Sequence, residues 1–255
     1  MNSHLIPGYH AVKETLLKGG GEVGVVWIAR GKSSPRVREI VHLAREKGVQ
    51  VQYKKTSELN DYLPGMTHQG IAAVSEKFSY ADLKQITKSA LQNPDCGLVL
   101  AADHITDEGN LGALIRTAVF FGVHGLILPK DRSAAVTAGV RKRSSGAYVH
   151  LPVTRVVNLS RTLGMMKKEG FWIIGAAGES STTIYQFDWC RDLVLVLGRE
   201  DKGLTRSIRE QCDQLVAIPP GGKTGSLNVS VAGGVILAEV MRRREASMGE
   251  TLKRT

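Results

Sequence analysis

The feature that most constrains the fold is a series of short, continuous apolar runs after residue 97, separated by stretches with helical spacing of apolar residues. Strands of a parallel sheet are buried on both faces, so they are continuously apolar rather than alternating. Such strands alternating with helices predict an α/β fold, in which helices cover both faces of an open parallel sheet. The expected strands are 98–102, 125–128, 172–176, 193–197 and 215–218. The expected helices are 111–121, 136–145, 159–169, 206–211 and 229–243.

The first 76 residues predict a small α/β unit of their own. Apolar runs are typical of strands, and helical spacing precedes or follows each of them. Pro35 opens one helical pattern and Gly48 follows its end, as expected for helix termini. We therefore expect four parts: an N-terminal α/β domain (1–76), a linker ending in a short helix (77–96), a C-terminal domain (97–245) and a tail (246–255).

Composition narrows the class of protein. Of the 255 residues 42% are hydrophobic and 23% are charged, which excludes extensive disorder. There is no apolar run long enough for a membrane span, and residues 1–14 lack the apolar core of a signal peptide. The three cysteines are far apart and odd in number, which predicts a reducing, cytoplasmic location.

The net charge of +10 favours a polyanionic partner such as nucleic acid, although a charge that only maintains solubility is the alternative. Ligands of open α/β sheets bind beyond the carboxyl ends of the strands. That rule selects the loops 103–110, 198–204 and 219–228. No phosphate loop, dinucleotide fingerprint, hydrolase elbow or zinc-ligand spacing is present.

Taken singly, these loops have ordinary interpretations. Asn110 is a potential helix cap, Arg116 a surface charge and the 198–204 loop a tight charged turn. In the third loop Asn228 or Ser230 is expected to cap the next helix. The glycines at 233 and 234 cost that helix about 1 kcal/mol each relative to alanine, which indicates a close approach by another part of the chain.

Together the three loops resemble the three signature motifs of the SpoU/TrmH family of SPOUT RNA methyltransferases. Segments 8–12, 68–71, 129–133 and 153–159 resemble one branch, which includes the bacterial enzyme that 2′-O-methylates a guanosine in the P loop of 23S rRNA. The resemblance implies a C-terminal trefoil knot that holds S-adenosylmethionine (SAM), a ribosomal-protein-like N-terminal domain that binds RNA, and a homodimer. The glycines at 221, 222, 225, 233 and 234 are then expected where backbone threads past backbone.

The resemblance also implies site residues. The implied reaction moves a methyl group from SAM to a ribose 2′-hydroxyl without a metal. Arg116 is implied either as the general base or as a phosphate clamp that stabilises the alkoxide. Glu200 is implied as the residue that orients either Arg116 or the ribose. The residues implied around the target ribose are Asn110, Arg116, Glu200, Ser226 and Asn228. Those implied at SAM are Gly198, Ile218 and Leu227.

A run of cations in 130–143 is a candidate phosphate track, with a solvated helix face as the alternative. It comprises Lys130, Arg132, Arg141, Lys142 and Arg143. The expected partner is 23S rRNA or a ribosomal precursor particle. Methylation of a tRNA guanosine, self-protection against an antibiotic, and a non-catalytic role in ribosome assembly remain alternatives. Arg199, where a small residue is more usual in the family, is a departure that bears on target contacts.

Overall fold

The computed structural model describes residues 4–18, 23–75, 78–199, 202–223 and 225–252, with side chains up to residue 247. The chain divides into two compact units. The first consists of residues 1–79 and 135–150, and the second of 80–134 and 151–255. The sequence analysis assigned residues 135–150 to the C-terminal domain. In the structure this segment belongs to the first unit, because its contacts are with residues of that unit.

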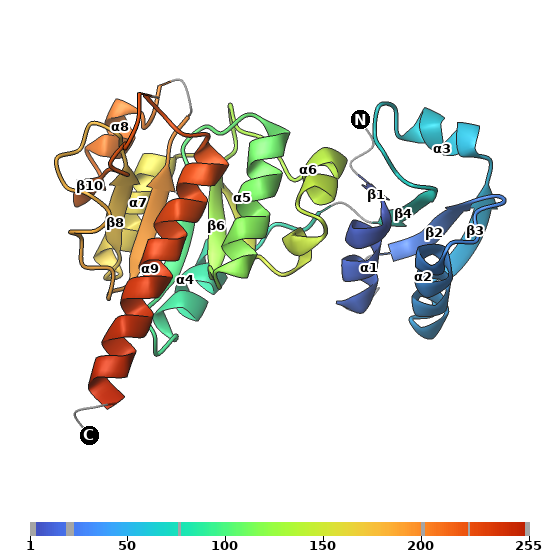
Figure 1. Ribbon diagram of the computed structural model, residues 1–255, viewed down its shortest axis with the longest axis horizontal. Coiled ribbons are helices and arrows are strands. Elements are labelled where there is room, and N and C mark those ends of the chain that lie inside the picture. Colours follow the sequence, from blue (N-terminus) through green and yellow to red (C-terminus); the bar gives the residue numbers. More distant parts are fainter. Residues whose placement is uncertain (1–3, 19–22, 76–77, 200–201, 224, 253–255) are drawn as a thin grey trace. The chain divides into compact units, whose positions relative to one another are not determined.

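The first unit contains a four-stranded sheet of order β1-β4-β2-β3 (Figure 1). β2 and β3 are parallel, and β4 is antiparallel to both β1 and β2. One apolar core joins the sheet to α1 and α2, and a smaller one joins its other side to α3. The elements are β1 (Leu5–Pro7), α1 (Tyr9–Leu17), β2 (Val23–Ala29), α2 (Pro35–Glu46), β3 (Gln50–Lys54), α3 (Thr56–Tyr62) and β4 (Ile71–Ser75).

The segment 135–150 contributes α6 (Ala138–Arg143) and the short 3-10 helix η1 (Ala147–Val149). Arg141 is only 1% exposed. Its Nη1 donates to Ser75 Oγ at 2.5 Å, and its guanidinium lies 5.4 Å from the centre of the Tyr148 ring. Tyr148 in turn shares a 2.8 Å hydrogen bond with Thr15. The prediction that Arg141 contacts RNA is therefore wrong, because its guanidinium is buried inside the first unit, where it contacts Ser75 and Tyr148.

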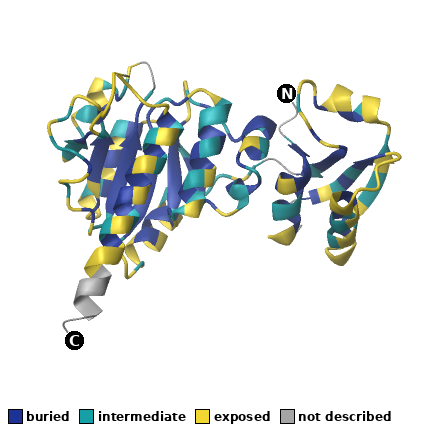
Figure 2. Cartoon of the chain, in the orientation of Figure 1, coloured by how far each residue is buried: buried dark blue, intermediate teal, exposed yellow. Residues whose placement is uncertain are grey.

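The second unit confirms the predicted parallel sheet. Its six strands have the order β10-β8-β9-β5-β6-β7, and every pairing between them is parallel. Figure 2 shows these strands to be largely buried. They are β5 (Leu98–Ala102), β6 (Gly125–Pro129), β7 (Val153–Val156), β8 (Trp172–Ala176), β9 (Leu193–Leu197) and β10 (Gln214–Val216). β7 had not been predicted as a strand.

Helices cover both faces of this sheet. α5 (Glu108–Phe120) and α9 (Val229–Leu252) pack together on one face (Figure 1). On the other face, α4, α7 and α8 share an apolar core with the strands. α4 lies within the predicted linker, so that segment is an integral part of the second unit. These helices are α4 (Leu83–Leu91), α7 (Leu159–Lys168) and α8 (Arg206–Arg209).

Of the five glycines expected at close approaches, Gly233 shows such an approach, by side chains, and the other four do not. A Cβ at Gly221, Gly222 or Gly225 would meet no atom of the described residues within 4 Å, so the described part of the chain does not require glycine there. A Cβ at Gly233 would lie 2.9 Å from side-chain atoms of Leu114 and Leu197. Its small size thus allows α9 to pack on α5 and β9, and Gly234 has only ordinary contacts. The trefoil knot stays a prediction.

None of the described helices has the length and apolarity to cross a membrane.

Candidate functional site

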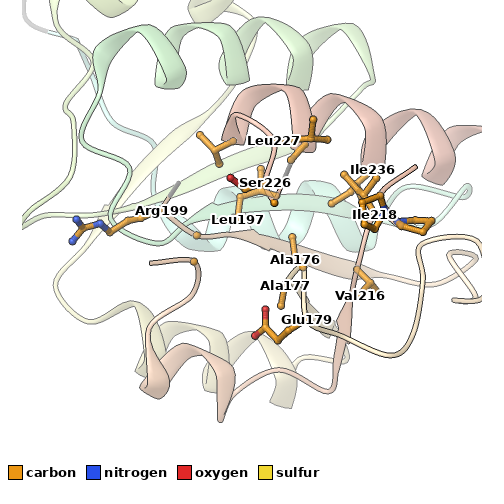
Figure 3. Close-up of a pocket in the computed structure, with 18 of the residues that line it drawn as sticks. Ala176, Ala177, Glu179, Leu197, Arg199, Val216, Ile218, Ser226, Leu227 and Ile236 are labelled. Atoms are coloured by element: carbon orange, nitrogen blue, oxygen red, sulfur yellow. The ribbon is translucent and has the colours of Figure 1, made fainter. Parts of the chain in front are cut away.

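A pocket of about 780 Å³ lies beyond the carboxyl ends of β8, β9 and β10 (Figure 3). Two of the three loops selected from the sequence line it, as the rule for open α/β sheets predicts. The loop after β8 lines it too, and had not been selected. The lining consists of 176–179, 197–199, 218–222 and 225–227, with Gly203, Arg209, Val216, Val229, Ala232 and Ile236.

Gly198 is required at the base of this pocket. A Cβ there would lie 2.5 Å from the carbonyl oxygen of Gly203, so only glycine allows the two backbone segments to approach. Two backbone hydrogen bonds join Arg199 and Gly203. The amide of Arg199 donates to the carbonyl of Gly203 at 3.1 Å, and the amide of Gly203 donates to the carbonyl of Arg199 at 2.8 Å. Gly203 has a φ of +61°, which also favours glycine. The two glycines therefore set the shape of the turn.

A buried carboxylate fixes the end of that turn. Asp103 is fully buried, and its Oδ2 accepts a 2.7 Å hydrogen bond from the amide of Thr205. The backbone amide of Asp103 donates to the carbonyl of Leu197 at 2.8 Å. The first loop is thus tied to the second on both sides of the turn, which holds Gly198 and Gly203 in place.

The pocket has an apolar wall and a polar side. Figure 3 shows Ile218, Ile236 and Val216 together at one end of it, whereas Ser226 and Leu227 lie across the pocket from Glu179. The three residues predicted for SAM, namely Gly198, Ile218 and Leu227, all line this pocket. A slot with apolar side chains and glycine-rich loops suits a flat, largely apolar ring.

Two predicted ribose-site residues bond to each other across 118 positions of sequence. The Asn228 side-chain amide donates to Asn110 Oδ1 at 2.8 Å. Asn228 Oδ1 accepts from the amide of Ser230 at 3.0 Å, which confirms Asn228 as the cap of α9. The cap predicted at Asn110 is wrong: Asp107 caps α5 and accepts from the amide of Asn110 at 2.8 Å.

The other predicted ribose-site residues differ in where the structure places them. Arg116 is exposed on α5, the helix that also carries Asn110. Ser226 is exposed and lines the pocket, two positions before Asn228. Glu200 lies outside the described residues. The structure therefore joins the first loop to the third through the asparagine pair, next to the pocket.

Comparisons with known proteins decide the family. Residues 97–238, more than half of the chain, match the SpoU rRNA Methylase family. The chain belongs to the SpoU rRNA methylase family. Residues 5–81 also match a second domain family, described as RNA 2′-O ribose methyltransferase substrate binding. This match covers the sheet of the first unit with α1, α2 and α3, and it ends at residue 81, just inside the second unit.

Full-length relatives of this SpoU methylase are known. It is 39% identical to the 23S rRNA (guanosine-2′-O-)-methyltransferase RlmB of Escherichia coli K12, over 95% of this chain and 99% of the relative. It is 37% identical to YacO of Bacillus subtilis, a putative TrmH family tRNA/rRNA methyltransferase, over 93% and 94%. The SpoU methyltransferase AviRb of Streptomyces viridochromogenes, in complex with AdoMet, has a TM-score of 0.77, 25% identity and coverage of 95% and 90%.

The predicted RNA contacts of this SpoU methylase fall in different units. Lys130 and Arg132 are exposed in the second unit, whereas Lys142 and Arg143 belong to the first. Burial lowers the pKa of Lys142. The structure thus does not support one continuous phosphate track within a unit. Arg141, as shown above, is buried.

Sequence reasoning missed two charged residues of the pocket. Glu179 follows β8, and Arg209 lies at the end of α8. The two form an ion pair, and the hydrogen bond from Arg209 lowers the pKa of Glu179. The rule about carboxyl ends of strands applies equally to β8, so it would have found this loop. Among the described residues, no three His, Cys, Asp or Glu side chains cluster to hold a metal ion.

Proposed function

We propose that this protein transfers a methyl group from SAM to the ribose 2′-hydroxyl of a guanosine in 23S rRNA, in the P loop of the peptidyl-transferase region. The observation that carries the proposal is the end-to-end match with RlmB of E. coli, a 23S rRNA guanosine-2′-O-methyltransferase, across both units. A tRNA enzyme with the catalytic unit alone would leave the match to the substrate-binding family unexplained.

The pocket suits the adenosine part of SAM. Ile218 and Leu227 would flank the adenine ring, and Gly198 keeps the adjoining turn tight. When bound, SAM supplies a methyl group on a positively charged sulfur, an electrophile strong enough to react without a metal. The surrounding residues then have to bring a ribose hydroxyl into line and accommodate the loss of its proton.

We assign these tasks to the residues around the asparagine pair. Asn110 and Asn228 hold each other and so fix the two loops between which the ribose would lie. Arg116 would grip the adjoining phosphate and stabilise the developing alkoxide, because a guanidinium stays protonated and is a poor base. Ser226 would position the ribose by hydrogen bonding, and Glu200 would orient Arg116.

RNA binding is assigned mainly to the first unit. Residues 1–79 and 135–150 contain 14 Lys and Arg against seven Asp and Glu, whereas the rest of the chain contains 20 against 17. Most of the net positive charge therefore belongs to the first unit, where it favours contact with phosphates. Free 23S rRNA or a ribosomal precursor particle is the proposed partner, which makes the cytoplasm the proposed location.

Methyl transfer tests the proposal. The protein is incubated with labelled SAM and unmodified 23S rRNA, with tRNA in parallel, and the labelled nucleoside is identified after digestion. We expect label in 2′-O-methylguanosine from 23S rRNA. Label in tRNA alone would instead identify a tRNA methyltransferase. No label in rRNA, ribosomal precursors or tRNA, despite SAM binding, would indicate a non-catalytic assembly factor.

We also propose a homodimer formed through α5 and α9. Large apolar side chains are exposed on these two adjacent helices and in the loop before α9. They are Phe120 (81% exposed), Leu227 (46%), Val231 (50%) and Val235 (36%). Covering them would remove apolar surface from water.

The expected result in analytical ultracentrifugation is a species of about twice 27.6 kDa at micromolar concentration. Val231→Asp should shift it toward the monomer, because the interface would then bury an unpaired charge. As a control, Val157→Asp changes an exposed valine (76%) that lies on neither helix. A wild-type chain that sediments only as a monomer would refute the dimer.

A further inference from the structure

Glu179 introduces a negative charge into a pocket whose wall is otherwise mainly apolar or glycine. Its side chain is 61% exposed, so it is open to a ligand. Figure 3 shows it on the side of the pocket across from Ser226 and Leu227. It therefore faces the same space as the residues proposed for SAM, from a loop that none of the three signature motifs includes.

Arg209 holds this carboxylate in place. Its Nη1 pairs with Oε1 of Glu179, and its Nε donates to the carbonyl of Leu204 at 3.2 Å. The guanidinium is thus anchored to backbone at the end of the Gly198 turn while it binds the carboxylate. The result is an ionised, oriented carboxylate whose charge is already balanced by a neighbour.

We infer that Glu179 binds the ribose hydroxyls of the methyl donor, and that Arg209 is its positioning residue. This inference rests on the proposed function. A carboxylate has about four acceptor positions, and the ion pair with Arg209 and a hydrogen bond from the residue's own backbone amide leave positions for two more donors. The 2′- and 3′-hydroxyls of a nucleoside supply two neighbouring donors, and acidic side chains bind ribose hydroxyls in the same way in dinucleotide sites.

The amino-acid end of the donor is the competing ligand for this carboxylate. Its ammonium group would also pair with an acid. Because Arg209 already neutralises Glu179, however, the local charge favours neutral hydroxyl donors over a second cation. A zwitterionic end is strongly hydrated, and an open rim lets it stay in water.

Calorimetric titration of the full-length protein with two ligands distinguishes binding of the ribose hydroxyls from binding of the amino-acid end. S-adenosylhomocysteine has both ribose and amino-acid end, whereas 5′-methylthioadenosine has the ribose but lacks the amino-acid end. We expect Glu179→Gln to weaken binding of both ligands by a similar factor, about tenfold or more, as for loss of a charged hydrogen bond. For methylthioadenosine analogues without the 2′- or 3′-hydroxyl, the same substitution should have a clearly smaller effect.

Glu210→Gln is the matched control. Glu210 forms a similar ion pair with Arg206 at 2.9 Å, but neither residue lines the pocket. This variant should bind every ligand as the unmodified protein does. Arg209→Lys should retain most of the affinity and Arg209→Gln should lose it, again only for ligands with both hydroxyls, which a merely structural role would not produce.

Each alternative result has a distinct meaning. If Glu179→Gln weakens only S-adenosylhomocysteine, the carboxylate binds the amino-acid end and the inference is overturned. Unchanged affinity for both ligands overturns it too, while leaving the proposed function intact. If the unmodified protein binds neither ligand, the proposed function fails and the inference falls with it.

Discussion

Replacing Arg116 with alanine is expected to lower the rate of methyl transfer to 23S rRNA by about 1,000-fold or more, comparable to removal of a key oxyanion donor. The reason is that the departing proton leaves negative charge on the 2′-oxygen, and Arg116 is the fixed cation that we assign to it. SAM affinity should stay within about twofold, since Arg116 does not line the pocket. Single-turnover kinetics with labelled SAM, together with calorimetry, measures both quantities.

The matched control is Arg161→Ala, which removes another exposed arginine from a helix of the same unit. Its rate should equal that of the unmodified protein. Arg116→Lys retains a positive charge but not the planar fork, so we expect partial activity at most. A rate for Arg116→Ala within tenfold of the unmodified enzyme would contradict the assigned role.

Replacing Gly198 with alanine is expected to destabilise the protein by about 3 kcal/mol, the upper part of the range for overpacking. The added methyl would lie 2.5 Å from the Gly203 carbonyl oxygen, and backbone on both sides leaves no flexible side chain to move aside. The turn must open, so the pocket changes shape as well. Denaturant unfolding should show the lost stability, and S-adenosylhomocysteine should no longer raise the melting temperature.

Gly222→Ala provides the comparison, because Gly222 lines the same pocket but a Cβ there would meet nothing within 4 Å. Its stability should change by less than about 0.5 kcal/mol, as for most exposed substitutions. Equal stabilities for the two variants would mean that the Gly198 turn adapts to a side chain. The close approach would then have no energetic significance.

β5, β6, β8 and β9 were predictable because each has five residues and is largely apolar on both faces. β5, β6, β8 and β9 lie at the expected positions, and β10 overlaps its predicted run. β1 and β10 have only three residues each, and β7 has four. A strand as short as β7 leaves no clear periodicity, so it was missed.

Residue type and order also predicted two of the three loops that line the pocket, since parallel strands bring their carboxyl ends to one edge. Local pattern was less informative about single side chains. Arg141 follows a helix start within a run of cations and so resembles a surface charge, yet it is buried. The contacts that bury it come from Ser75 and Tyr148, and the distance to Ser75 in the sequence gives no signal of this.

The sequence by itself determined the parallel α/β architecture, two of the loops that line the pocket and, through three motifs in order, the family. These properties depend on periodicity and residue type, which are local. Only the tertiary structure decided that Asn228 bonds to Asn110, that Gly198 faces Gly203, and that Glu179 and Arg209 line the same pocket as these two glycines. Such contacts join elements distant in the chain, so their partners are set by how the strands are ordered in the sheet and how the helices pack on it.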